Sequence, residues 1–527
     1  MKKIRNILFI MADQLRWDYL SCYGHTHLKT PNIDKLAAKG VLFDRAYVQS
    51  PVCGPSRASF YTGRTVFSHG STWNRVPLPI GELTLGDYLR PLGVRTAVVG
   101  KTHMEPDSDG MARLGLNQST EIGVVISHPG FEPYELDDGL HPDVAFKKRG
   151  GKLRYNDWLK EKGYKGDNPW NDYANSAEGP NGEILSGWYL RNSNLPARIK
   201  EEHSETAYMT LRAKEFIEES GDMPWLCHLS YIKPHWPYMA PAPYHNMYSS
   251  DSFKEVKRHP DEKINPHPVY DAFMKMDVSQ VFSKDQTRET VLPAYMGMIK
   301  QIDDHLGELF NWLKDSGKAD ETMIVFTSDH GDYLGDHWLG EKELFHEVSV
   351  RVPLIIFDPR PEADISRGTI VNELVEAIDL VPTFLSAKRA PPADHRLEGM
   401  SLEPFLHGKD VTDWREAVFS EIDYSYYRAR DILGVGNYDA RGYMMRTQEW
   451  KYIYFRGFEP QLFDLTADVE EFFDLGVDPD HEGIRKTMHA LLLERLISRK
   501  NRVAQSDAEL ERNRGNEEAS GILIGKW

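Results

Sequence analysis

Two acidic segments, far apart in the sequence, carry side chains that suit a divalent cation. Asp13 and Gln14 follow the apolar run Ile7–Ala12, and Asp329-His330 follow a second apolar run. A single Asp after a strand is more often a helix N-cap than a metal ligand. Two such carboxylates at one sheet edge, with an amide oxygen and an imidazole, instead offer the ligands that a hard divalent ion prefers. We therefore expect the two segments to meet in a metal site.

Basic side chains lie in further short segments, at Arg57, Lys101, His103, His235 and Lys342. Taken singly, each has an ordinary explanation as a solvated charge or a hydrogen-bonded loop residue. The whole chain has 63 basic and 80 acidic residues and a net charge of −17, which argues against nucleic acid or an anionic membrane as a partner. An anionic substrate would need a local cluster of positive charge, and these residues could form one.

The segment Cys53-Gly54-Pro55-Ser56-Arg57 is followed by Thr62-Gly63-Arg64. A lone cysteine before a helix would be interpreted as a buried structural residue, with Pro55 near the first helical position. The combined pattern resembles the modification motif of the sulfatase family, within the alkaline phosphatase superfamily. In that family the cysteine is oxidised to formylglycine, an aldehyde whose hydrate supplies the nucleophile. The resemblance implies the same for Cys53, with a formylglycine-generating enzyme as a maturation partner.

Three further segments match the family in its order along the chain. Gly100-Lys101-Thr102-His103 resembles its Gly-Lys-x-His, and Pro234-His235-Trp236-Pro237 resembles its Pro-His-x-Pro. Lys342 lies nine residues before Arg351-Val352-Pro353, the spacing at which the family carries an active-site lysine. Because the matches extend to Leu462–Leu465 near the C-terminus, the resemblance covers most of the chain.

The resemblance implies one divalent metal beside the modified cysteine. The implied ligands are Asp13, Gln14, Cys53, Asp329 and His330. Many sulfatases carry Asp at the position of Gln14 and Asn at that of His330, so this ligand set has one negative charge fewer. A less neutralised ion is a stronger electrophile and is less clearly calcium. We expect calcium, with manganese as the alternative.

The resemblance also implies roles for the basic residues. The implied catalytic residues are Cys53, Arg57, Lys101, His103, His235 and Lys342, and the implied substrate-binding residues are Asn74, Lys101, His235 and Lys342. In this scheme the lysines stabilise the charge on the transferred group. His235 or Lys342 protonates the leaving group, and His103 is the base that releases the product.

The expected function is hydrolysis of sulfate monoesters, of the arylsulfatase type. The alternative is a phosphonate monoester hydrolase or phosphodiesterase with the same nucleophile, which could accept both ester types. Lys101 and His103 favour sulfate, because the phosphonate branch of the family carries hydroxyl side chains there. Gln14, His330 and the stretch 225–248 favour phosphorus. A silent binding protein on this fold would be expected to have lost a nucleophile, ligand or lysine, and none is lost.

Short apolar strands alternate with amphipathic helices, which predicts an α/β fold. The resemblance implies the alkaline-phosphatase-like form, a large mixed sheet flanked by helices. Asp13, Lys101, His235 and Asp329 each lie at or shortly after the C-terminal end of a predicted strand. Open α/β sheets bind ligands at that edge, so we expect these four residues to converge on it.

A chain of 527 residues predicts more than one domain. We expect a catalytic α/β domain over residues 1–410, in which 105–200 form an irregular cover over the active site. A small α+β domain with an antiparallel sheet and one helix is expected over 411–500. The tail over 501–527 is charged early and apolar at its end, so docking on a neighbouring subunit and disorder both stay open. A homo-oligomer is expected.

The three cysteines, Cys22, Cys53 and Cys227, do not form a disulfide framework. A reducing compartment is the default for such a chain. The run Ile7–Ala12 is too short for a signal peptide and is predicted as a strand. No stretch is apolar and long enough to span a bilayer. These features predict a cytoplasmic protein with a small-molecule ester as its substrate.

Overall fold

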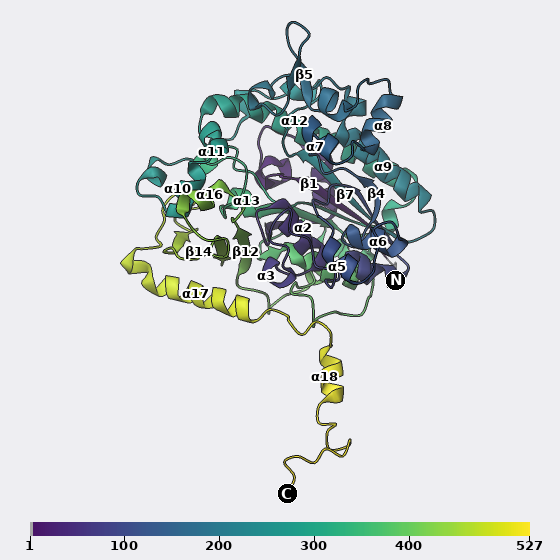
Figure 1. Cartoon of the computed structure of the whole chain (residues 1–527), viewed down its shortest axis with the longest axis vertical. Coiled ribbons are helices and arrows are strands. Elements are labelled where there is room, and N and C mark those ends of the chain that lie inside the picture. The colour runs from purple at the N-terminus through teal and green to yellow at the C-terminus, as the bar shows by residue number, and fades with distance from the viewer. Residues whose placement is uncertain (1–3) are drawn as a thin grey trace.

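The computed structural model describes residues 4–527 and shows a large α/β body, a smaller sheet beside it and a C-terminal arm (Figure 1). Within the described residues, the large sheet has nine strands. Their order is β10 (Thr369–Val371), β2 (Val41–Tyr47), β9 (Arg351–Phe357), β8 (Thr322–Ser328), β1 (Asn6–Asp13), β7 (Trp225–Pro234), β3 (Arg95–Gly100) and β4 (Glu132–Leu136), with β11 (Val375–Glu376) beside β2. β9 is antiparallel to both neighbours and the other pairs are parallel. The predicted mixed α/β sheet is confirmed.

The centre of the sheet is buried on both faces, which explains the continuous apolar runs of its strands. In β1 alternate side chains enter two separate cores: Ile7, Phe9 and Met11 pack on one face, and Leu8 and Ile10 on the other. Strands β8, β1, β7 and β3 are parallel neighbours, so their C-terminal ends lie at one edge. That edge carries the site described below.

Helices cover both faces. On the first face lies the wholly buried α2 (Cys53–Thr62), which ends at Gly63 with a φ of 68°. On the second face lie α9 (Glu205–Glu219) and α12 (Asp285–Asp315). α2 begins at Cys53, two residues before Pro55, which the sequence places near the first helical position. α12 has Pro293 in its interior. The remaining helices of the body are α1 (Pro31–Lys39), α3 (Val66–His69), α4 (Leu85–Leu89), α10 (Pro268–Met274), α11 (Asp277–Phe282), α13 (Glu347–Val350), α14 (Leu380–Ala387) and α15 (Glu403–Leu406).

The segment 105–200 has more regular structure than the sequence predicts. It contains α5 (Ser108–Arg113), α6 (Glu121–Ser127), α7 (Asp143–Lys148), α8 (Arg154–Glu161), the strand β4 and a hairpin of β5 (Ser176–Glu178) and β6 (Ile184–Ser186). The helices are too short to show a clear apolar period. β4 contains Pro133 and lies at the sheet edge, where proline is tolerated.

The smaller sheet is antiparallel and four-stranded, as predicted. Its order is β12 (Val418–Asp423), β13 (Arg441–Arg446), β14 (Trp450–Phe455) and β15 (Gln461–Asp464). The helix α17 (Glu482–Ile497) packs on it through Met488 and Leu492. A short helix α16 (Arg428–Leu433) follows β12. The predicted domain limits at 410 and 500 stay predictions.

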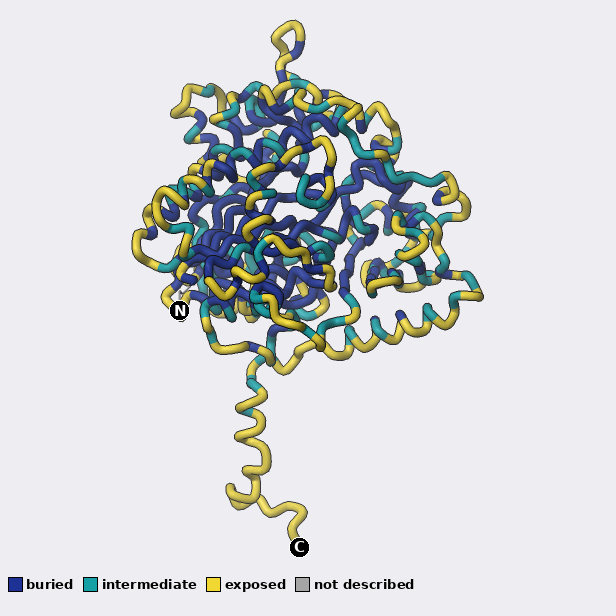
Figure 2. Tube along the Cα trace, turned by 180° about the vertical axis from the view of Figure 1, so that it is seen from behind, coloured by how far each residue is buried: buried dark blue, intermediate teal, exposed yellow. Residues whose placement is uncertain are grey.

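The C-terminal arm leaves the body after α17 and carries α18 (Asp507–Asn513), which is exposed along its length (Figure 2). Its apolar end is also exposed, and Ile524 is 95% accessible. Among the residues from 4 to 527, no helix has the length and apolarity needed to cross a membrane. The cytoplasmic location and the oligomeric state stay predictions.

Candidate active site

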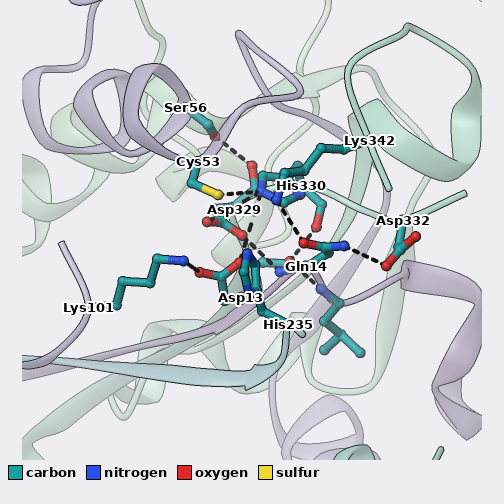
Figure 3. A network of polar contacts seen from close by, with 12 residues as sticks. Asp13, Gln14, Cys53, Ser56, Lys101, His235, Asp329, His330, Asp332 and Lys342 are labelled. Carbon is teal, nitrogen blue, oxygen red and sulfur yellow. Dashed lines mark hydrogen bonds and ion pairs between the residues drawn. The ribbon is translucent and has the colours of Figure 1, made fainter. Parts of the chain in front are cut away.

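The four parallel strands at the centre of the sheet end in four polar residues. Asp13 is the last residue of β1, and Asp329, His235 and Lys101 directly follow β8, β7 and β3. All four side chains are buried. The structure therefore brings together at one edge the residues that the sequence places after separate strands (Figure 3).

Asp13, Cys53, Asp329 and His330 form a buried group whose ligand atoms all lie within 4.8 Å of one another. The Cys53 Sγ atom is 3.0 Å from His330 Nε2. His330 Nδ1–H donates to the Gly331 carbonyl oxygen at 2.9 Å, which leaves a lone pair on Nε2. Asp13 Oδ1 is buried and accepts no hydrogen bond from any described residue. This orphaned carboxylate oxygen beside a neutral imidazole nitrogen fits a divalent cation.

Gln14 connects this group to Lys342. Its backbone N–H donates to Asp329 Oδ1 at 3.0 Å, and its Oε1 accepts from Lys342 Nζ at 2.8 Å. Its Nε2 donates to Asp332 Oδ2 at 2.5 Å, which orients the amide. Asp332 is buried, and burial raises its pKa to about 6. Sequence reasoning gave Asp332 no role, because a single Asp in a loop does not indicate its distant partner.

Helix α2 presents Cys53 and Arg57 on the same face, one turn apart. The Arg57 guanidinium joins the two carboxylates: its Nε donates to Asp329 Oδ2 at 2.8 Å and its Nη2 to Asp13 Oδ2 at 3.1 Å. All three side chains are fully buried. Arg57 therefore orients the two acidic ligands. Burial would lower its pKa, but the two carboxylates raise it above the ordinary arginine value, so Arg57 is charged.

The buried charges are balanced within the site. Burial alone would raise the pKa of Asp13, but the charges of Lys101, whose Nζ lies 2.5 Å from Asp13 Oδ2, and of Arg57 hold it well below its ordinary value. Burial raises the pKa of the Cys53 thiol to about 11. An unmodified Cys53 would thus be a protonated thiol at neutral pH and a poor nucleophile.

Three of the four predicted substrate-binding side chains line a cleft of about 780 Å³, and the fourth, Lys101, is fully buried against Asp13 and does not line it. Asn74, His103, His235 and Lys342 face it, and Asn74 Oδ1 accepts from the Gly54 N–H at 2.7 Å. Burial and Lys101 lower the pKa of His103 and of His235 well below the ordinary histidine value, so both are neutral.

Aromatic residues form the outer wall of the cleft, and sequence reasoning missed them. Trp73 stacks on Tyr426 with ring centroids 5.4 Å apart and meets Tyr427 edge-on at 4.7 Å. Glu343 also lines this wall. Tyr426 and Tyr427 follow β12 of the smaller sheet, so nothing in their local sequence connects them to a site at the edge of the large sheet.

Two family models match the chain. The model described as Sulfatase matches residues 5–388, and the model described as N-sulphoglucosamine sulphohydrolase, C-terminal, matches residues 335–498. Together they span the large sheet, the site and the smaller sheet.

Individual proteins are similar over most of their length. The chain is 30% identical over 503 residues to the multifunctional alkaline phosphatase superfamily protein PehA of Trinickia caryophylli, covering 91% of this chain and 93% of that protein. It is 27% identical to an arylsulfatase of Clostridium perfringens, covering 94% and 95%. The crystal structure of the phosphonate monoester hydrolase of Agrobacterium radiobacter superposes with a TM-score of 0.79 at 28% identity, covering 93% and 95%. On these matches the chain belongs to the sulfatase family of the alkaline phosphatase superfamily.

Proposed function

We propose that this protein hydrolyses phosphonate monoesters and phosphodiesters, and sulfate monoesters at a lower rate, with a formylglycine made from Cys53. This order reverses the one expected from Lys101 and His103. Its support includes the similarity to PehA, whose name describes it as multifunctional, and to a phosphonate monoester hydrolase. The arylsulfatase similarity keeps sulfate esters among the substrates.

The observation that carries the proposal is the size and lining of the cleft. Sulfate monoesters, phosphonate monoesters and phosphodiesters each carry a single negative charge, so one cationic site can bind all three. The phosphorus substrates differ in carrying two organic groups on the central atom, where a sulfate monoester has one. A cleft of about 780 Å³ with Trp73 and Tyr426 on its wall has room for a second organic group.

The buried group of Asp13, Cys53, Asp329 and His330 fits one divalent metal. The adjacent Gln14 would add its amide oxygen as a fifth ligand, an atom that accepts from Lys342 in this structure. Such an ion, when bound, polarises the ester and favours the ionised form of an oxygen nucleophile. Formylglycine would supply that oxygen in place of the protonated thiol. We expect calcium, and metal analysis of the purified protein distinguishes it from manganese.

The remaining residues bind the substrate and move protons. Burial would lower the pKa of Lys342, but Glu341, whose carboxylate lies 3.8 Å from Lys342 Nζ, raises it, so Lys342 stays charged and presents its ammonium group to the anion in the cleft. Lys101, buried behind the cleft wall, adds positive charge to the site. His235 Nδ1–H donates to the Trp236 carbonyl oxygen at 2.6 Å, so its Nε2 is an acceptor in the free enzyme. It becomes a proton donor to the leaving group only after the anionic substrate raises its pKa. The neutral His103 is suited to accept a proton.

The test compares kcat/KM for an aryl phosphonate monoester and an aryl sulfate with the same phenol leaving group. The enzyme is first shown by peptide mass spectrometry to carry formylglycine at position 53. A Cys53→Ala protein, purified identically, controls for contaminating hydrolases. We expect the phosphonate to be the better substrate. A clear preference for the sulfate, or full activity of protein containing only unmodified Cys53, would overturn the proposal.

A further inference from the structure

The loop that carries Lys342 has a strained backbone. Between β8 and α13, five non-glycine residues have φ values in the left-handed region: Leu334, His337, Trp338, Glu341 and Glu343. Glu341 and Glu343 flank Lys342, with φ of 62° and 94°. Non-glycine residues keep such conformations only where their surroundings hold them. The contacts of this loop therefore decide where Lys342 lies.

One of these contacts comes from the C-terminal part of the chain. Glu343 is only 3% exposed, and its Oε1 accepts a hydrogen bond of 2.6 Å from the Tyr427 hydroxyl. The Tyr427 ring is held edge-on against Trp73 at 4.7 Å and against Phe273 at 5.5 Å. Tyr427 immediately precedes α16, so Glu343 is tied to the segment between β12 and α16.

The same loop reaches the metal-ligand group through the next side chain. Lys342 Nζ donates to Gln14 Oε1 at 2.8 Å, and the Gln14 backbone N–H donates to Asp329. A continuous path thus runs from Tyr427 through Glu343 and Lys342 to the ligands. Glu343 lines the same cleft as Lys342.

We propose that Glu343 is a positioning residue for Lys342: its carboxyl group, anchored by the Tyr427 hydroxyl, keeps the Lys342 ammonium directed at Gln14 and at the bound anion. The inference rests on the proposed function. It adds Glu343 to the residues that position the active site, and it predicts that activity falls at alkaline pH. The groups that face Glu343 are Glu341 and Lys342 on its own loop, His330 in the ligand group, and Tyr427.

The charge state of Glu343 follows from this environment. Burial, and then the charge of Glu341, raise the pKa of its carboxyl from 4.5 to about 8. At neutral pH Glu343 is therefore an uncharged carboxylic acid, and it does not compete with the anionic substrate for the Lys342 ammonium group. Above about pH 8 an ionised Glu343 would compete with the substrate for that ammonium. Activity should fall on the alkaline side for this reason.

The kinetic test uses holoenzyme with confirmed formylglycine and an aryl phosphonate monoester, across the neutral and alkaline pH range. Glu343→Gln keeps an acceptor for the Tyr427 hydroxyl and cannot ionise, so it should retain most of the neutral-pH activity and lose the fall above about pH 8. Glu343→Leu and Tyr427→Phe break the anchor and should lower kcat/KM about 10- to 100-fold, mostly in kcat. Tyr438→Phe, at a tyrosine that is 82% exposed and does not line the cleft, is the matched control and should match wild type.

A second measurement needs no substrate. The raised pKa of Glu343 makes folding stability depend on pH. Between pH 4.5 and about 8 the native state holds a proton on Glu343 that the unfolded chain has lost. The free energy of unfolding therefore falls as the pH rises through that window. The melting temperature of wild type should therefore fall over this window relative to that of Glu343→Gln. Coincident stability profiles, or wild-type kcat/KM in both Glu343→Leu and Tyr427→Phe, would overturn the inference. Wild-type enzyme inactive on both ester types would instead overturn the proposed function.

Discussion

Arg57 gives the sharpest test of how the site is held together. Its guanidinium donates at 2.8 Å to Asp329, at 3.1 Å to Asp13 and at 2.7 Å to Ser230 Oγ, and the arginine and both carboxylates are fully buried. Arg57→Met removes the cation and leaves two buried carboxylates with only Lys101 close to one of them. Removing one partner of a buried ion pair costs about 3–5 kcal/mol.

This cost should depend on metal. A bound divalent cation would itself compensate the two carboxylates, so the penalty of Arg57→Met should be large in excess EDTA and smaller in excess calcium. The assay is thermal unfolding followed by circular dichroism in both conditions. In EDTA the melting temperature should fall by about 3–5 °C for a chain of this length, and calcium should recover part of that loss in addition to the stabilisation it gives wild type.

The matched control is Arg456→Met. Arg456 also pairs with a carboxylate, at 3.1 Å from Asp439, but is 58% exposed, and exposed pairs contribute only about 0–1 kcal/mol. If Arg57→Met melts like this control in EDTA, the buried pairs do not stabilise the site as reasoned. If its deficit is the same with and without calcium, the two carboxylates do not hold the ion.

Three further predictions concern the nucleophile, the joint between the two sheets and the arm. Cys53→Ser has one hydroxyl where a hydrated aldehyde has two, so it should be modified once by substrate and stall; intact-protein mass spectrometry should show the adduct, and rapid multiple turnover would contradict this. Glu421 accepts a hydrogen bond from the Phe67 N–H at 2.5 Å, and burial raises its pKa to about 8. The melting temperature of wild type should therefore fall, relative to that of Glu421→Gln, as the pH rises from 4.5 through about 8. If the two proteins show the same pH dependence of the melting temperature over that range, the prediction is wrong. The exposed apolar end of the arm predicts a contact with another subunit, so deleting residues 501–527 should reduce the molar mass of the assembly in light scattering. The melting temperature of the body should stay nearly unchanged. An unchanged molar mass would exclude the arm from assembly.

The local sequence determined the elements and much of the site. Continuous apolar runs identify the central strands, since parallel strands buried on both faces have little choice of residue. Asp13, Lys101, His235 and Asp329 could be placed at one edge from their positions after these strands. The cysteine motif marks the start of α2, although the helix begins at Cys53 itself rather than at Pro55. The family, too, could be identified from short motifs in order along the chain.

The tertiary structure alone decided which side chains meet. The sheet order β8-β1-β7-β3 is not sequential, so partners such as Gln14 and Lys342, 328 residues apart, carry no mark of each other in the sequence. The orienting bond from Gln14 to Asp332 and the reach of Tyr427 into the cleft depend on this long-range packing. The balance between sulfate and phosphorus substrates belongs here as well. The residue types determine the charge of the site. The volume of the cleft around the bound anion depends on segments that are far apart in the sequence and meet only in the folded protein.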